Sequence, residues 1–303
     1  MDKNRLHGVH TALITPMAEG MVAFAELERL IDAQLDSGIA GIVPCGTTGE
    51  SPTLSESEHL QVIRTSIEVA SGKVPVIAGT GANSTAEALA LTRAADEAGA
   101  DAFLLVAPYY NKPSQDGLLA HFSALAEITE KPIVLYSIPS RCGIEISTDV
   151  VCKLREKYPH VCALKEAGGR SAKVSETLIA IDNEFVVLSG DDGLTLPFIA
   201  CGAKGVVSVA SNLVPDTVVK MVTYALAGDF ENARSLHLEN YELFTDLFCE
   251  PNPVPVKYLM QMHGVIKSSE VRLPLCPPSP SSLNLLKGIG AKLDLREKVL
   301  HES

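Results

Sequence analysis

The chain contains 303 residues, of which 46% are hydrophobic and 20% are charged, and it carries a net charge of -12 at pH 7. A chain of this length can bury a substantial core as one large domain or two smaller ones. The acidic balance argues against nucleic acid as the main partner, because phosphate binding needs a basic surface. No apolar stretch approaches the roughly 18 residues of a membrane span.

The first ten residues, MDKNRLHGVH, lack the apolar core of a secretory signal peptide, so we expect a cytoplasmic protein. The seven cysteines are scattered without a C-x-x-C pair. In a reducing compartment this pattern favours small buried thiols and gives no support for a zinc site.

Eight short apolar runs recur along the chain up to residue 210 and predict parallel strands that are buried on both faces. They span residues 10–15, 39–46, 74–79, 101–108, 132–138, 161–166, 185–190 and 204–210. Segments with helical periodicity separate them, and one of these opens with Ser55 followed by Glu58 three residues later, which predicts a capping box.

A strand followed by a helix, repeated about eight times, predicts an α/β protein with a (β/α)8 TIM barrel. An open doubly wound sheet is the alternative, but its G-x-G-x-x-G signature is absent after the first strand. Beyond residue 228 the pattern becomes helical. We therefore predict a catalytic barrel over 1–228 and a C-terminal helical region over 229–303, with helices at 231–250, 254–266 and 281–300 and a proline-rich connector at 272–280.

The distinctive polar residues follow the ends of predicted strands, where a barrel of this kind places its catalytic groups. Lys165 ends an apolar run and, because side chains alternate along a strand, points away from its neighbour Glu166. Burial would lower the pKa of this amine, and a neutral amine can attack a carbonyl to form a Schiff base. A lysine that reaches solvent along its apolar stem is the structural alternative, and position alone leaves both open.

Other strand ends carry residues that could assist such chemistry. The segment GTTGES, residues 46–51, offers glycines, hydroxyls and backbone N–H groups suited to an anion, although such runs also form ordinary turns. Tyr109, Tyr110 and Tyr136 are either core aromatics or proton-transfer groups. Arg141 is either a surface charge or a partner for a carboxylate.

Asp192 lies in the segment SGDDG and is expected to serve in a turn or as a helix cap.

Six motifs taken together resemble those of the dihydrodipicolinate synthase family, whose members are class I pyruvate aldolases. The resemblance covers nearly the whole chain in order, in the segments GTTGES, PYYNKPSQDG, YSIPSRCG, ALKEAGG, LSGDDG and EPNPVPVK. It implies condensation of pyruvate with L-aspartate-4-semialdehyde to 4-hydroxy-tetrahydrodipicolinate, in the diaminopimelate route of lysine biosynthesis.

The resemblance also implies residue roles. Lys165 would form the Schiff base with pyruvate, Thr47 and Thr48 would hold its carboxylate, and Arg141 would bind the carboxylate of the semialdehyde. A proton relay would comprise Thr48, Tyr136 and Tyr110. 

The resemblance extends to assembly and cofactors. Tyr110 would reach across a dimer contact, and the backbone of Gly190 and Val207 would shape the site. The family implies a homotetramer made of two dimers, with no organic cofactor and no metal.

Many members of this family carry a feedback site for lysine. The matching positions here are Ser51, Pro52, Glu56, His59, Asn83, Glu87 and Tyr109. The alternative for these segments is an ordinary helix N-terminus with its caps. Ser137 and Cys142 depart from the residues that the family often has beside the tyrosine and the arginine, and we expect these departures to concern the packing around the site and not its chemistry.

Two other functions remain open at this point. N-acetylneuraminate lyase or a keto-deoxy sugar acid aldolase would share the fold and the lysine, but the arginine at 141 favours a short substrate with a carboxylate. A non-catalytic barrel that senses pyruvate or lysine would have no need of the complete set formed by Lys165, Thr48, Tyr110 and Tyr136.

Overall fold

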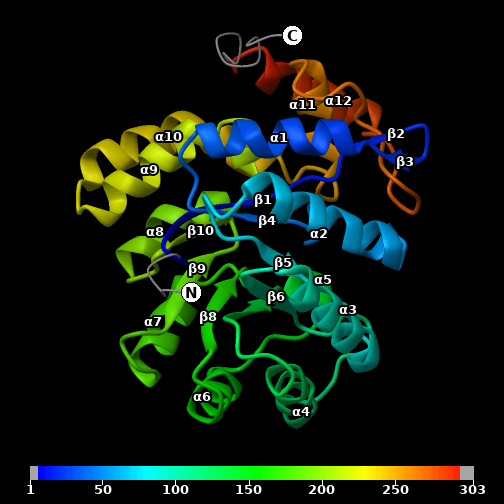
Figure 1. Ribbon diagram of the computed structural model, residues 1–303. Coiled ribbons are helices and arrows are strands. Elements are labelled where there is room, and N and C mark those ends of the chain that lie inside the picture. Colours follow the sequence, from blue (N-terminus) through cyan, green and yellow to red (C-terminus); the bar gives the residue numbers. More distant parts are fainter. Residues whose placement is uncertain (1–5, 294–303) are drawn as a thin grey trace.

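The computed structural model describes residues 6–293. Eight parallel strands form one sheet in the order β4, β1, β10, β9, β8, β7, β6, β5. A parallel bridge between Ile42 and Val76 joins the two ends of this sheet, beside β4 and β5, and closes it into a barrel (Figure 1). The strands are β1 Gly8–Ala12, β4 Gly41–Val43, β5 Ile77–Gly79, β6 Ala102–Val106, β7 Ile133–Ser137, β8 Val161–Glu166, β9 Val186–Ser189 and β10 Gly205–Ser208.

All eight predicted strands are present, so the predicted (β/α)8 barrel is confirmed. Their apolar runs are continuous because one face of each strand packs into the barrel and the other packs against helices. The close contact between β1 and β10 depends on Gly205, whose φ is +152°. A Cβ at this position would lie 1.9 Å from the carbonyl oxygen of Gly8.

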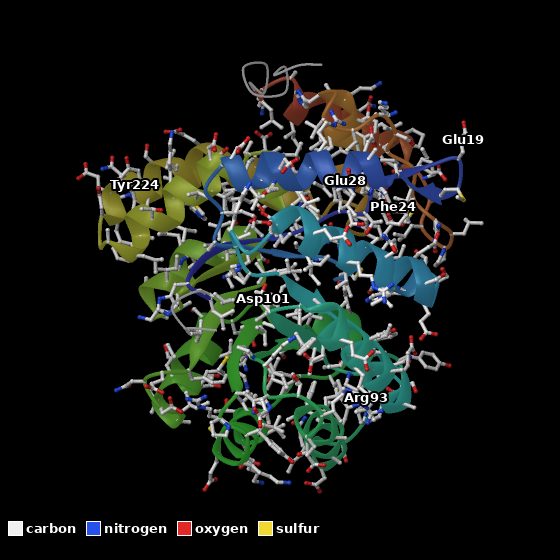
Figure 2. The ribbon with its side chains drawn as sticks, viewed as in Figure 1. Glu19, Phe24, Glu28, Arg93, Asp101 and Tyr224 are labelled. Atoms are coloured by element: carbon white, nitrogen blue, oxygen red, sulfur yellow. The ribbon has the colours of Figure 1, made fainter. Side chains whose placement is uncertain are left out.

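Helices alternate with the strands and surround the barrel. Charged side chains such as those of Glu28 on α1 and Arg93 on α3 are exposed on the outside of this layer (Figure 2). The predicted capping box is confirmed, since Ser55 Oγ accepts from the N–H of Glu58 and Glu58 Oε2 accepts from the N–H of Ser55. The helices are α1 Phe24–Asp36, α2 Glu56–Ala70, α3 Thr85–Ala98, α4 Gln115–Ala126, α5 Pro139–Cys142, α6 Thr148–Lys157, α7 Ser171–Ala180, α8 Thr195–Ala200 and α9 Pro215–Leu226.

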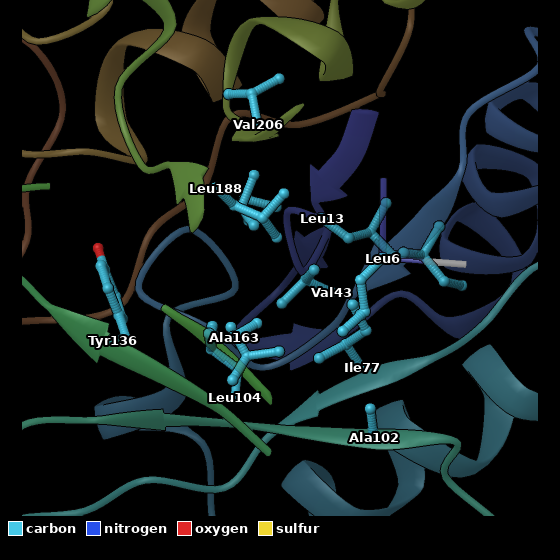
Figure 3. Packing of buried hydrophobic residues seen from close by; sticks show 14 of the residues in the cluster. Leu6, Leu13, Val43, Ile77, Ala102, Leu104, Tyr136, Ala163, Leu188 and Val206 are labelled. Carbon is cyan, nitrogen blue, oxygen red and sulfur yellow. The ribbon is translucent and has the colours of Figure 1, made fainter. Parts of the chain in front are cut away.

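The core consists of aliphatic side chains from the strands, among them Val43, Leu104 and Leu188, which are almost completely buried. Tyr136 belongs to the same cluster, and its hydroxyl points away from Leu104 (Figure 3). The interior of the barrel is therefore a packed core and not an open channel.

After the barrel the described chain continues as α10 Phe230–Asp246, α11 Val254–Met262 and α12 Pro280–Gly290. The segment 272–280 contains no regular helix or strand before α12, as predicted. Residues 294–300 of the last predicted helix lie outside the described residues. The division into a catalytic barrel of 1–228 and a helical region of 229–303 stays a prediction.

Two features complete the description of the fold. A small hairpin, β2 Met17–Ala18 and β3 Met21–Val22, was not predicted, because two-residue strands are too short to leave a period in the sequence. Between residues 6 and 293, the structure has no helix that is both long and apolar enough to cross a membrane.

Candidate active site

Lys165 lies near the end of β8, and its side chain is enclosed by the neighbouring strands. It is 6% exposed, and the sheet register places it beside Tyr136 on β7 and Leu188 on β9. Its Nζ atom lies 4.1 Å from the centre of the Tyr136 ring. The amine therefore does not reach solvent, and the structural alternative of a lysine extended to the surface is wrong.

The environment of Lys165 favours the neutral amine. Burial lowers its pKa from 10.5 to about 7, the charge on Asp192 opposes this shift, and the charge on Arg141 reinforces it. A large part of the amine is then unprotonated at neutral pH. An unprotonated amine is the form that attacks a carbonyl carbon.

Glu166 points away from this amine, as the strand alternation predicted. Its carboxylate is buried and accepts a hydrogen bond from the N–H of Gly168 at 2.6 Å. Burial raises its pKa to about 7, and the neighbouring charge of Glu145 acts in the same direction. The carboxylate thus belongs to a cluster behind β8 and does not serve as the counter-ion of Lys165.

Tyr136 presents a protonated phenol beside Lys165. It is 4% exposed, and burial raises its pKa to about 12, although a hydrogen bond with Thr47 and the charge on Arg141 oppose the shift. The hydroxyl therefore keeps its proton at neutral pH, and it can donate a hydrogen bond or pass a proton on.

The predicted anion-binding segment forms a tight loop between β4 and the 3-10 turn Ser51–Thr53. Its own turns use the N–H groups of Gly49, Glu50 and Ser51. Within residues 6–293, the N–H groups of Thr47 and Thr48 have no acceptor. These two groups and the adjacent hydroxyls are the part of the loop that can hold an anion.

A pocket of about 210 Å³ opens beside this loop, and its lining includes Thr47, Tyr109, Tyr136 and Arg141. Arg141 lies on α5 at the exposed side of the pocket, and its Nη2 donates to the carbonyl oxygen of Asn252 at 3.4 Å. The structure therefore brings together three predicted features: the loop that carries Thr47 and Thr48 (the threonine loop), Tyr136 and Arg141. The register of β7 and β8 places Lys165 beside Tyr136.

Gly190 and Val207 lie at the neighbouring strand ends. A Cβ at Gly190 would lie 3.2 Å from Cε of Lys165, so a larger residue would press on the lysine stem. Val207 is buried on β10. Tyr110, in contrast, is 89% exposed with a φ of +73°, and it does not line the pocket.

A second pocket of about 400 Å³ lies next to the first, and Tyr109 lines both. Most of the residues predicted for a feedback site line this second pocket, namely Ser51, Pro52, Glu56, His59, Glu87 and Tyr109. Asn83 is the exception: it does not line the pocket, and its carbonyl oxygen accepts from Asn111 Nδ2 at 2.8 Å.

Asp192 lies in the 3-10 turn Asp192–Leu194, as expected, but it does not cap that turn. Asp191 caps the following turn, whereas the buried Asp192 accepts hydrogen bonds from the Ser208 hydroxyl and from the N–H groups of Val209 and Ala210. The side chain therefore fastens the end of β9 to the end of β10. A sequence of two adjacent aspartates does not indicate which one turns inward.

Sequence reasoning also missed two contacts from the C-terminal region. Asn252 donates to the Thr48 hydroxyl at 2.9 Å, and Lys257 forms an ion pair with Glu50 at 2.6 Å with both side chains fully buried. Asn252 and Lys257 belong to the segment EPNPVPVK, so the available signal was the presence of two polar residues in a proline-rich motif.

A closed (β/α)8 barrel with a desolvated lysine at the end of a strand, beside a tyrosine and an anion-binding loop, defines the class of Schiff-base aldolases. The chain matches the Dihydrodipicolinate synthetase family over residues 5–289. It therefore belongs to that family.

Individual relatives agree with this assignment. The chain is 48% identical over 282 residues to the 4-hydroxy-tetrahydrodipicolinate synthase of Persephonella marina. The aligned region covers 93% of this chain and 96% of that protein. The chloride-inhibited dihydrodipicolinate synthase of Acinetobacter baumannii complexed with pyruvate has a TM-score of 0.92 and 40% identity, over 95% of this chain and 98% of that one. The lysine-bound enzyme of Cyanidioschyzon merolae has a TM-score of 0.92 and 38% identity, over 96% and 99%.

The lowered pKa of Lys165 predicts that this residue destabilises the fold near neutral pH. The unfolded chain binds a proton at this lysine below pH 10.5, but the folded chain binds it only below about 7. The loss of folding free energy that Lys165 causes is therefore largest below pH 7, and it disappears as the pH rises toward 10.5. Lys165→Met should raise the free energy of unfolding at pH 7 by up to about 4 kcal/mol, with a smaller gain at pH 9.

Urea unfolding at several pH values measures this effect. The control is Lys220→Met on the exposed side of α9, which should change the free energy of unfolding little at any pH. A Lys165→Met variant whose stability relative to the original protein is the same at pH 7 and pH 9 would contradict the prediction.

Proposed function

We propose that this protein condenses pyruvate with L-aspartate-4-semialdehyde to form 4-hydroxy-tetrahydrodipicolinate, through a Schiff base on Lys165. The observation that carries the proposal is the buried amine with a pKa of about 7 beside the phenol of Tyr136. Membership of the Dihydrodipicolinate synthetase family supports the choice of substrates.

In the first step, the neutral amine of Lys165 attacks C2 of pyruvate and water leaves to give an imine. The unused N–H groups of Thr47 and Thr48 and their hydroxyls hold the pyruvate carboxylate. Because the carboxylate is anchored at the loop, the C2 carbonyl is directed toward the amine beside Tyr136.

In the second step, a proton leaves C3 of the imine and an enamine forms. The hydroxyls of Tyr136 and Thr48 carry protons between the substrate and the solvent. Tyr110 completes the relay from a neighbouring subunit of a homotetramer made of two dimers. Its 89% exposure and its absence from the lining of its own pocket support this role.

In the third step, C3 of the enamine attacks the aldehyde carbon of the semialdehyde. The aldehyde oxygen takes up a proton and becomes a hydroxyl group on that carbon. The Arg141 guanidinium at the exposed side of the pocket binds the carboxylate of this second substrate. The amino group of the semialdehyde then attacks the imine carbon, the ring closes, and Lys165 leaves as the free amine. One water is released overall.

The second pocket fits a regulatory role in the same pathway. Glu87 and Glu56 give it carboxylates that suit the ammonium groups of L-lysine, and Tyr109 lines both this pocket and the catalytic one. We therefore include feedback inhibition by lysine, the end product of the diaminopimelate route, in the proposed function. We place the protein in the cytoplasm.

Reduction with borohydride tests the Schiff base directly. Incubation of the protein with pyruvate and borohydride should add the mass of a reduced pyruvyl group to the peptide that contains Lys165, as measured by mass spectrometry. The Lys165→Met variant should show no adduct and no turnover of the two substrates. Protein that turns over both substrates without forming any adduct would contradict the mechanism.

Arg141→Ala distinguishes this reaction from a sugar-acid lyase. Loss of the cation should lower kcat/KM for the semialdehyde by on the order of 10- to 100-fold, because hydrogen bonds to charged groups contribute about 1.5–3 kcal/mol. Arg170→Ala is the matched control, since Arg170 is exposed and pairs with Glu145 outside the pocket. Equal activity of the two variants in steady-state assays would count against the proposed site.

L-lysine should inhibit the reaction, and Glu87→Gln should weaken this inhibition by about 10-fold, because the ammonium loses a charged partner. Glu97→Gln, at an exposed position on the same helix, is the control and should leave inhibition unchanged. Titration of lysine at fixed substrate concentrations measures both effects. Full activity in saturating lysine would eliminate the feedback site.

A further inference from the structure

One residue of the C-terminal region contacts two groups of the proposed active site. Asn252 precedes α11 and is 5% exposed. Its Nδ2 donates to the hydroxyl of Thr48 at 2.9 Å, and its carbonyl oxygen accepts from Arg141 at 3.4 Å. A residue outside the barrel thus holds both a relay hydroxyl and the cation at the exposed side of the pocket.

The direction of the first hydrogen bond determines what Thr48 can do. A hydroxyl has one hydrogen to donate and can accept at its oxygen. Because Asn252 supplies the hydrogen for this contact, the hydrogen of Thr48 stays available for the relay. The Oδ1 atom of Asn252 is buried and has no partner within residues 6–293, which leaves it for a bound substrate or a water.

A second contact holds the loop itself. Lys257 lies on α11 and forms the buried ion pair with Glu50, two residues after Thr48. The other carboxylate oxygen of Glu50 accepts from the N–H of Arg272 at 3.1 Å. Glu50 has a φ of +56°, a conformation that non-glycine residues rarely adopt and that the surroundings must enforce. Both oxygens of its carboxylate are therefore bound by the C-terminal region.

We infer that Asn252 and Lys257 are positioning residues for the proton-transfer steps: Asn252 orients the Thr48 hydroxyl, and Lys257 holds the loop that carries it. This inference rests on the proposed function. It makes the C-terminal helical region part of the active site, because the loop of β4 depends on that region for its conformation. Neither residue needs to touch pyruvate to act in this way.

A double-mutant cycle between Asn252 and Thr48 tests the first contact. The readout is the rate at which C3 of pyruvate takes up deuterium from D2O, which requires both the imine and the enamine, together with the yield of the borohydride adduct, which reports the imine alone. Asn252→Ala should slow deuterium uptake by about 10-fold or more while the adduct on Lys165 still forms. In a Thr48→Val background, Asn252→Ala should slow it no further.

Deuterium uptake at the original rate in Asn252→Ala, or equal slowing in both backgrounds, would overturn the role through Thr48. Failure of the original protein itself to form an adduct or to exchange deuterium would instead reject the proposed function. The two failures are therefore distinguishable.

Lys257→Met tests the second contact, and Lys173→Met is its control. Both lysines are at most 4% exposed at the side chain, but Lys173 lies on α7 and contacts Glu145 and Thr148 on the outer side of the barrel. Both variants should lower the melting temperature, because each removes the buried ammonium that a carboxylate contacts. Only Lys257→Met should raise the KM for pyruvate and slow deuterium uptake, measured where the variant is folded.

Equal kinetic effects in the two lysine variants, or an unchanged KM and exchange rate in folded Lys257→Met, would overturn the positioning role of the ion pair. If Lys257→Met does not fold, Lys257→Arg supplies the same comparison, since it keeps the charge and displaces the donor atoms. The positioning role then predicts slower deuterium uptake in Lys257→Arg, and uptake at the original rate would overturn it.

Discussion

The desolvation of one amine is the constraint on which the rest of the site depends. Closure of the sheet surrounds the end of β8 with neighbouring strands, so Lys165 lies under the ring of Tyr136 and next to Gly190. Burial then lowers the pKa of the amine to about 7, even though Asp192 partly opposes the shift. The surrounding groups are arranged around an uncharged nitrogen, and an uncharged nitrogen is what imine formation requires.

The barrel alone does not complete this arrangement. The loop after β4 carries Thr47 and Thr48, and it is fastened to residues more than 200 positions away in the sequence through Asn252 and Lys257. A buried ion pair is costly to form unless its charges are well matched, and removal of one partner is more costly still. The Glu50–Lys257 pair therefore ties the geometry of the threonine loop to the folding of the C-terminal helices.

The features that the sequence predicted are local ones. Continuous apolar runs indicated eight buried strands, Ser55 and Glu58 indicated a helix start, and alternation along β8 placed Lys165 and Glu166 on opposite faces. Each of these follows from residues within one turn or one strand of each other.

The features that the sequence did not predict are pairings across long distances along the chain. Nothing in the neighbourhood of Lys257 identifies Glu50 as its partner, and two adjacent aspartates do not reveal that Asp192 bonds to β10. The role of Tyr110 stays a prediction for a related reason, since its side chain is 89% exposed. Such pairings depend on how the elements pack, which periodicity does not report.

The most direct test is a measurement of the pKa of Lys165 itself. NMR titration of protein labelled at the lysine side chains, with the resonance of Lys165 assigned by its absence from Lys165→Met, reports the protonation of this amine without any substrate. The account predicts a midpoint near pH 7, well below the ordinary value of 10.5. A midpoint near 10.5 would contradict it, because the amine would then be charged throughout the neutral range.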